Sequence, residues 1–162
     1  EHCCLEIAWR EMLVSEFLEY TLDKFIFRVA NDRCYNADGV WAKEENGQIT
    51  VGLSDFLQQR SGDIAFADVA ASGTELSIGD EVASIETIKV DISLSSPVSG
   101  TVIETNPAME MEPEVINEDP YGDGWLAIIK GADWLADQAR LLNPRAYFEH
   151  MVAEAEEEAK NL

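Results

Sequence analysis

The chain has 162 residues, which is enough for one domain with appendages and a buried core. Its 32 acidic and 11 basic residues give a net charge of −21, and such a field repels nucleic acid and anionic membrane surfaces. We therefore expect neither a nucleic-acid nor a membrane partner. The charge favours either a basic protein partner or simple solubility of an abundant protein.

The first stretch of the chain carries apolar residues at helical spacing. They are Leu5, Trp9, Met12, Leu13, Phe17 and Tyr20, with charged residues largely between them. The pattern predicts a helical extension over residues 1–26, whose apolar stripe packs on the core or binds a partner. It contains no basic segment followed by an apolar run, so we expect no secretory signal. No apolar run in the chain approaches the length of a membrane span, so we expect none.

The cysteines do not form the pattern of a disulfide framework. Cys3 and Cys4 are adjacent and would pair poorly in ordinary backbone geometry, and Cys34 stands alone. Reduced thiols and a cytoplasmic location follow as expectations. A redox role for Cys34 is the open alternative.

Between residues 27 and 131 the pattern changes to short runs of β-branched and aromatic residues separated by Gly, Asn, Asp and Pro. The runs predicted as strands are 48–53, 63–69, 81–85, 90–94, 100–105 and 125–129. Residues 53–59 are predicted as one short helix. Many short strands at this spacing indicate a mainly β domain, a compact sandwich or flattened barrel.

Residues 132–162 are predicted to be helical and to pack on the β domain. One helix is expected over 134–142. Asn143 is a good N-cap and Pro144 suits the first helical position, so a second helix is expected to begin there. Its run of acidic residues at 154–158 is expected to be a solvated face.

Lys89 is unusual because Arg60 is the only other basic residue between Glu44 and Ile129. Alternation over 88–95 places Ile88, Val90, Ile92 and Leu94 on one side and Lys89 on the other, solvent-facing side. Turn signals on both sides predict a hairpin with Lys89 near its tip. An exposed lysine on a rigid scaffold suits enzymatic modification. From the pattern alone, a lysine that discourages edge pairing of strands is the preferred interpretation.

Four ordered motifs reverse that preference. Residues 86–90, E-T-I-K-V, resemble the E-S-V-K-A lipoylation motif of the glycine cleavage H-protein family, and S-P-V-S-G at 96–100 matches the family's segment. T-V-G-L-S-D-F at 50–56 with G-D-I at 62–64 resembles T-V-G-I-T-D-Y and G-D-I. Residues 117–125 match N-x-x-P-Y-x-x-G-W. Each motif alone is weak, but the ordered set is specific. The chain thus resembles this family of lipoyl carriers.

The resemblance implies a lipoyl-type fold of two small antiparallel sheets, with Lys89 on a hairpin turn. It also implies that lipoate is the cofactor, attached by an amide to Lys89, and that a lipoylating enzyme is a partner. The attached dithiolane would carry a bound intermediate and reducing equivalents between partner enzymes. The protein would be a carrier and not an enzyme.

The chain departs from the family near the start of the domain. Where glycine-cleavage members carry H-E-W, this sequence has Gly39-Val40-Trp41, and Ile88 and Val90 replace smaller or less branched residues beside Lys89. These departures resemble the lipoate-binding proteins of bacterial sulfur oxidation, which serve a heterodisulfide-reductase-like complex. We therefore predict sulfur oxidation by a slight preference, with glycine cleavage and its enzymes as the alternative.

Two other classes of function are weighed against a carrier. An enzyme acting alone lacks candidate residues: the only histidines are His2 and His150, no Cys/His spacing suggests a zinc site, and Ser99 lies outside a nucleophile elbow. We expect no catalytic residue and no metal site. An acidic interaction module with an unmodified Lys89 remains the second alternative.

Overall fold

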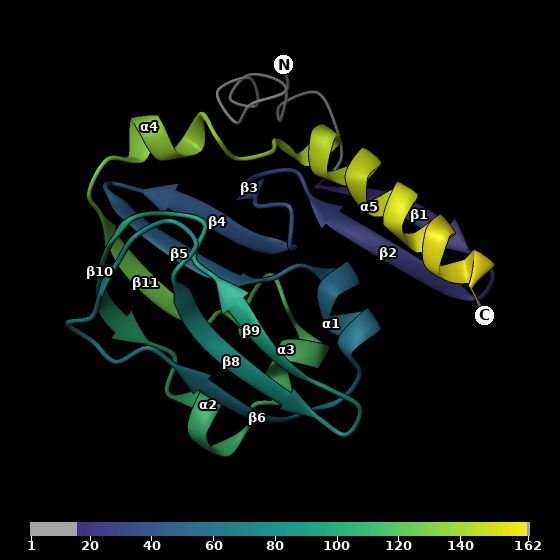
Figure 1. The fold of residues 1–162 in the computed structure, drawn as a ribbon, viewed down its shortest axis with the longest axis horizontal. Helices are drawn as coiled ribbons and strands as arrows, with labels where there is room; N and C mark the ends of the chain where they lie inside the picture. The colour runs from purple at the N-terminus through teal and green to yellow at the C-terminus, as the bar shows by residue number, and fades with distance from the viewer. Residues whose placement is uncertain (1–15, 162) are drawn as a thin grey trace.

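The computed structural model describes residues 16–161 and is mainly β (Figure 1). The strands are β1 (Phe17–Leu22), β2 (Phe25–Ala30), β3 (Cys34–Tyr35), β4 (Val40–Glu45), β5 (Gln48–Leu53), β6 (Ile64–Val69), β7 (Glu75–Leu76), β8 (Glu81–Thr87), β9 (Asp91–Ser95), β10 (Gly100–Thr105) and β11 (Ala127–Gly131). The helices are α1 (Asp55–Ser61), α2 (Ala108–Met111), α3 (Val115–Glu118), α4 (Trp134–Gln138) and α5 (Pro144–Lys160).

The strands form two facing antiparallel sheets and a separate hairpin. The larger sheet has the order β3-β4-β5-β11-β10-β7, the smaller sheet has the order β6-β8-β9, and β1 pairs only with β2. The predicted antiparallel sandwich is therefore confirmed, and each predicted strand is present with small shifts at its ends. The helical turns α2 and α3 are additions that the residue pattern did not predict.

Two apolar cores lie on opposite faces of the larger sheet. In β4, Val40 belongs to the core shared with the smaller sheet, whereas Trp41 belongs to a core shared with the β1–β2 hairpin and α5. Successive residues of a strand point to opposite faces, so one strand contributes to both cores. Both residues are almost fully buried. At β4, the larger sheet is thus covered on both faces.

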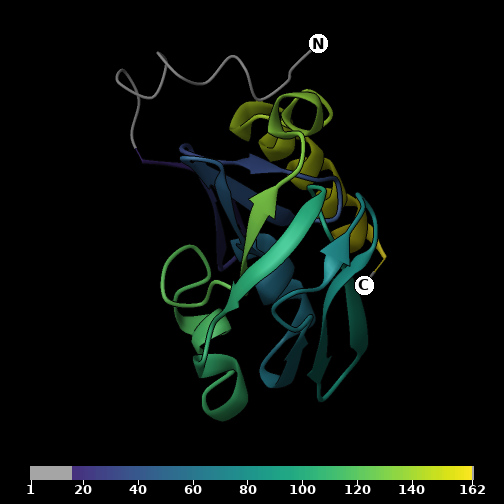
Figure 2. The same cartoon turned by 90° about the vertical axis from the view of Figure 1, so that its left-hand side faces the viewer.

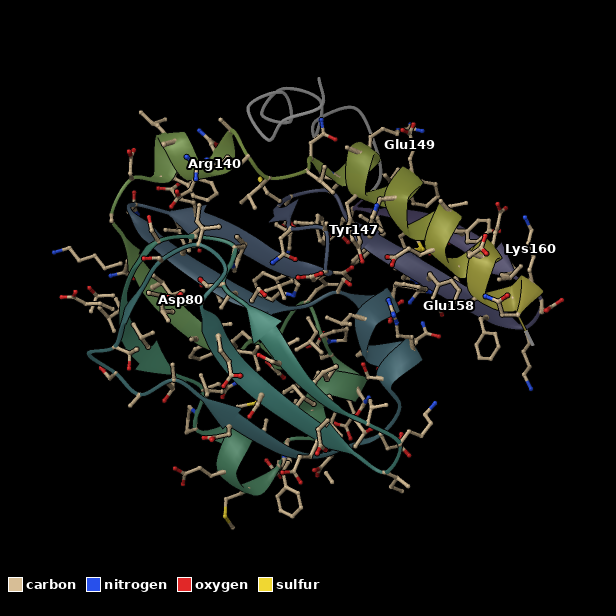
Figure 3. The ribbon with its side chains drawn as sticks, viewed as in Figure 1. Asp80, Arg140, Tyr147, Glu149, Glu158 and Lys160 are labelled. Carbon is tan, nitrogen blue, oxygen red and sulfur yellow. The ribbon has the colours of Figure 1, made fainter. Side chains whose placement is uncertain are left out.

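The C-terminal helix begins as the sequence predicts. The Asn143 side chain accepts a hydrogen bond from the Ala146 amide at 2.8 Å, and Pro144 follows at the first helical position. Tyr147 and Met151, one turn apart, are buried, and Figure 3 shows Tyr147 pointing into the molecule. The helix therefore closes the second core. Figures 1 and 2 show α5 and α2 at opposite ends of the molecule.

The predicted N-terminal helix is wrong for residues 17–26. β1 and β2 form a hairpin there, with Asp23 in the turn at a φ of 55°. The residues that pack against the second core are Leu18, Tyr20 and Leu22. They are spaced by two residues, which is the period of a strand. The helical pattern counted Phe17 and Tyr20, which are three residues apart, and left out Leu18 and Leu22. The remainder of the prediction, residues 1–15, lies outside the described residues.

The expectation of reduced thiols is also wrong for Cys34, which is buried and disulfide-bonded. The predicted cytoplasmic location therefore draws no support from this thiol. None of the helices in the described part of the chain combines the length and apolar character that a membrane span requires.

Candidate functional site

Lys89 lies in the turn that joins β8 to β9. Glu86 and Asp91 are the last partners of the paired strands, so residues 87–90 form the connection and Lys89 is exposed near its tip. The predicted hairpin is confirmed. The predicted alternation fails at its start, because Ile88 is 92% exposed and Val90 is 45% exposed. Both residues belong to the turn, and the apolar side of β9 begins only at Ile92.

The side chain of Thr87 holds this turn. Its hydroxyl accepts hydrogen bonds from the Lys89 amide at 3.2 Å and the Val90 amide at 3.0 Å, and it donates to the Val90 carbonyl at 3.1 Å. A Thr hydroxyl can satisfy backbone groups of a turn in this way. The backbone of Lys89 is thus fixed without using the lysine side chain.

The end of the Lys89 side chain lies beside Gly62, which ends α1. A Cβ atom added to Gly62 would lie 3.0 Å from Lys89 Cε and 3.6 Å from Nζ. Gly62 has a φ of +90°, a conformation that L side chains rarely adopt. The glycine therefore ends the helix and leaves a bare backbone surface for the lysine stem.

The ammonium group of Lys89 is chemically accessible. Of the ion pairs within residues 16–161, none involves Lys89, although Asp63, Glu86 and Asp91 are exposed around the turn. An exposed primary amine with no ion-pair partner can be acylated without breaking a contact. The geometry fits an amide-linked arm, and the acidic surroundings suit a basic partner surface.

The other lysines occupy different environments. Lys24 lies over the ring of Phe25 at 5.8 Å, and Lys43 pairs with Asp32 at 3.1 Å. Lys130 belongs to β11, and Lys160 ends α5. Lys24 also lies in a hairpin turn, between β1 and β2, so what distinguishes Lys89 is that its turn joins two strands of the smaller sheet.

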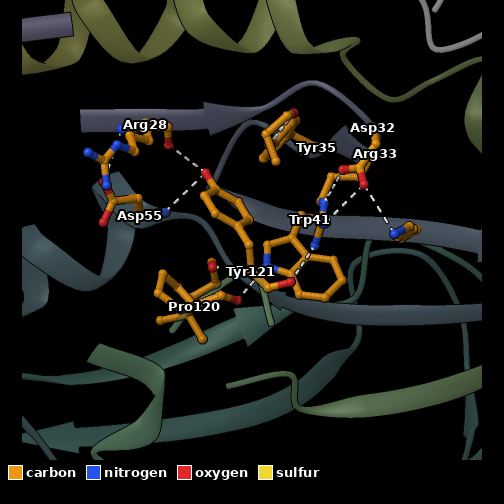
Figure 4. A network of polar contacts seen from close by, with 11 residues as sticks. Arg28, Asp32, Arg33, Tyr35, Trp41, Asp55, Pro120 and Tyr121 are labelled. Atoms are coloured by element: carbon orange, nitrogen blue, oxygen red, sulfur yellow. Dashed lines mark hydrogen bonds and ion pairs between the residues drawn. The ribbon is translucent and has the colours of Figure 1, made fainter. Parts of the chain in front are cut away.

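The segment 117–125, which carries the N-x-x-P-Y-x-x-G-W motif, ties several elements together. Pro120 accepts a hydrogen bond from Trp41 Nε1 at 3.0 Å, and the Tyr121 hydroxyl donates to the Arg28 carbonyl at 2.7 Å (Figure 4). Burial raises the pKa of Tyr121 to about 12, so its hydroxyl keeps its proton at neutral pH. The motif therefore anchors β2 and β4.

Arg33 is a buried cation that the sequence pattern did not reveal. Its guanidinium lies 4.5 Å from the centre of the Trp41 ring and donates to the Tyr121 carbonyl and to Asp32 (Figure 4). Partial burial raises the pKa of Asp32, but Arg33 and Lys43 outweigh it and hold that pKa below its usual value. A groove of about 330 Å³ opens beside Arg33, and Lys89 does not line it.

Gly39, at the position of the family's histidine, is packed closely. A Cβ atom added there would lie 3.0 Å from both Ser54 Oγ and Tyr147 Oη and 3.3 Å from Leu57 Cβ. Ser54 and Tyr147 also share a hydrogen bond of 2.9 Å. The space that an imidazole would need is therefore occupied by the α1 cap and by α5.

An antiparallel two-sheet sandwich that presents one lysine at a hairpin turn is the architecture expected of a lipoyl-type carrier domain. Comparison with known proteins agrees: the family model for glycine cleavage H-protein matches residues 33–154. The chain belongs to the glycine cleavage H-protein family of lipoyl carriers. It is accordingly a carrier and not an enzyme, and its cofactor is a covalently attached lipoate.

Individual relatives show how far the similarity extends. A glycine cleavage system H protein from Salinibacter ruber is 42% identical over 120 residues, covering 74% of this chain and 95% of that protein. Glycine cleavage system H protein 4 from Aquifex aeolicus is 36% identical over 132 residues, covering 82% and 77%. The crystal structure of a glycine cleavage system H protein from Mycobacterium marinum matches with a TM-score of 0.67 at 28% identity, covering 74% and 95%.

Proposed function

We propose that Lys89 is the attachment point of lipoate in this chain. The observation that carries the proposal is its place: an exposed amine with no ion-pair partner among residues 16–161, on a hairpin turn, within a motif that resembles the family's lipoylation sequence. In attachment, the neutral Nζ attacks the activated carboxyl carbon of lipoate, the activating group leaves, and the nitrogen loses a proton. The resulting amide carries no charge.

The chain's own contribution is to position the arm. Thr87 fixes the backbone at the base of the arm, and the bare backbone of Gly62 supports the lysine stem. Beyond that point the attached lipoyl group would reach partner enzymes. When bound, the dithiolane would open on reduction of its S–S bond to two thiols, which would hold an intermediate and exchange reducing equivalents.

We propose glycine cleavage as the process that this carrier serves, with a lipoylating enzyme and the glycine-cleavage enzymes as its partners. The arm would carry the aminomethyl group left after decarboxylation of glycine. The family match and the named relatives support this alternative better than our sequence-based preference for sulfur oxidation, which they do not support. A cytoplasmic location stays a prediction.

One observation keeps sulfur oxidation as a second candidate. The family's glycine-cleavage members carry histidine where this chain has Gly39, and Ser54 and Tyr147 crowd that position. A carrier without this imidazole could serve a heterodisulfide-reductase-like complex and hold a sulfur substituent.

Loading by glycine decarboxylase separates the two candidates. The lipoylated protein is incubated with glycine and a glycine decarboxylase, and release of carbon dioxide is followed. The glycine-cleavage proposal predicts release that depends on lipoylated protein and disappears in Lys89→Arg. Lys130→Arg, which changes an exposed lysine of β11, is the matched control and should retain activity. A fully lipoylated protein that gives no more release than Lys89→Arg would contradict glycine cleavage and favour the second candidate.

A further inference from the structure

The side chain of Asn117, in α3, forms hydrogen bonds to the corner between α1 and β6, which comprises Gly62 and its neighbours. Its Oδ1 accepts from the Ile64 amide at 3.0 Å, and its Nδ2 donates to the Gly62 carbonyl at 3.0 Å and to Gln58 Oε1 at 2.9 Å. α1 and α3 lie side by side in Figure 1, and residues of the two helices are in contact. One amide thus binds residues on both sides of Gly62.

The partners of Asn117 are themselves fixed. Gln58 is buried, its Nε2 donates to Asp55 Oδ1 at 2.8 Å, and its carbonyl accepts from the Gly62 amide at 3.1 Å. Gly62 therefore has its N–H held from α1 and its carbonyl held from α3. Ile64, two residues on, is buried in the core between the sheets. The corner is held in one arrangement despite the permissive backbone of its glycine.

The stem of Lys89 rests on this corner, since its Cε atom approaches the open side of Gly62. We propose that Asn117 is a positioning residue for the arm: by holding Gly62, it fixes the surface that sets the direction in which the Lys89 side chain leaves the protein. The effect on lipoylation rests on the proposed function of Lys89, whereas the effect on the direction of the side chain does not. The proposal also gives the first residue of the N-x-x-P-Y motif a role at a turn 28 residues away in sequence.

A matched control is available in Asn106. It makes three hydrogen bonds of the same kind, donating to the carbonyls of Asp123 and Trp125 and accepting from the Ala108 amide. None of its partners belongs to the corner at Gly62. A loss of general stability would therefore affect Asn106→Ala and Asn117→Ala alike, whereas loss of positioning would affect only Asn117→Ala.

The test uses the full chain and two readouts. In the unmodified protein, the nuclear Overhauser effect between the Lys89 Hε and Gly62 Hα protons should disappear in Asn117→Ala and persist in Asn106→Ala. The kcat/KM for enzymatic lipoylation of Lys89 should fall about three- to tenfold in Asn117→Ala alone, because a displaced reacting group loses rate. Asn117→Asp is a second variant should Asn117→Ala not fold; it keeps the acceptor for Ile64, removes both donors, and should weaken the same Overhauser effect.

Two results would overturn the proposal. One is a Lys89–Gly62 Overhauser effect of wild-type intensity in both Asn117→Asp and Asn117→Ala. The other is an equal weakening of that effect in Asn106→Ala. If the wild-type protein is not lipoylated but the Overhauser effect disappears in Asn117→Ala, the role proposed for Lys89 is contradicted, while the role of Asn117 in directing its side chain is supported.

Discussion

The turn at Lys89 and the segment Gly39–Trp41 differ in how much of the molecule depends on them. The turn is exposed, and the side chain of Thr87 holds its backbone locally. The segment is buried on both faces, with Val40 in one core and Trp41 in the other. The turn keeps the lysine of the family motif with changed neighbours at Ile88 and Val90, whereas the segment has Gly39 in place of the family's histidine. The attachment point thus lies on an exposed turn, and the departure from the family lies at a buried position.

The largest effect on stability is expected at Gly39. Gly39→Ala forces a side chain into a φ of +96° and places its Cβ 3.0 Å from Ser54 Oγ and Tyr147 Oη. Gly73 has the same φ but no atom within 4 Å of an added Cβ. We expect Gly73→Ala to lose about 1–2 kcal/mol from backbone strain, and Gly39→Ala to lose about 1–3 kcal/mol more from overpacking. Urea unfolding measures both, and equal losses would show that Gly39 is not crowded.

A smaller effect is expected at Thr87, and it should fall on modification more than on stability. Thr87→Val preserves the shape of the side chain but removes the hydroxyl that binds Lys89 and Val90, whereas Thr87→Ser keeps the hydroxyl. We expect Thr87→Val to lower kcat/KM for lipoylation about three- to tenfold, with a stability loss of about 1 kcal/mol or less. Enzyme kinetics and hydrogen exchange of the Val90 amide provide the measurements. If Thr87→Ser is as defective as Thr87→Val, the hydroxyl does not hold the turn.

The smallest effect on folding is expected at Ile88. Its side chain is 92% exposed, so Ile88→Ser should change the free energy of unfolding by no more than about 0.5 kcal/mol. An apolar side chain beside the attachment point can contact a partner, so we expect a severalfold rise in the KM of the partner enzyme for the lipoylated protein. Met111→Ser, at a residue that is 83% exposed on α2, is the control and should leave KM unchanged. An identical KM in both variants would remove Ile88 from the partner interface.

The features that could be predicted from the sequence are those that depend on residues close together in the chain. Residues 48–53 follow strand composition between turn signals, and Asn143 with Pro144 marks the start of α5; both predictions are confirmed. The β1–β2 hairpin was mistaken for a helix because the pattern counted Phe17 and Tyr20, three residues apart, and left out Leu18 and Leu22, which share a strand face with Tyr20.

The contacts around the candidate site could not be predicted in the same way. Asn117 binds Gln58 and Gly62, which lie 59 and 55 residues away in the sequence, and only the folded chain brings them together. Arg33 looks like an ordinary surface cation until the structure places it against Trp41 and Tyr121. Long-range hydrogen bonds and ring stacking leave no local pattern in the sequence. Strands, in contrast, leave a period of two residues, and helix caps leave a characteristic residue.

The central claim is that Lys89 carries lipoate, and mass spectrometry of the peptide that contains Lys89 tests it most directly. The protein is isolated from its native source, or produced with a competent lipoylating system, and then digested. The account predicts a lipoyl mass increment on that peptide and on none that contains Lys43 or Lys130, and its loss in Lys89→Arg. An unmodified Lys89 in protein that is active as a carrier would contradict the account.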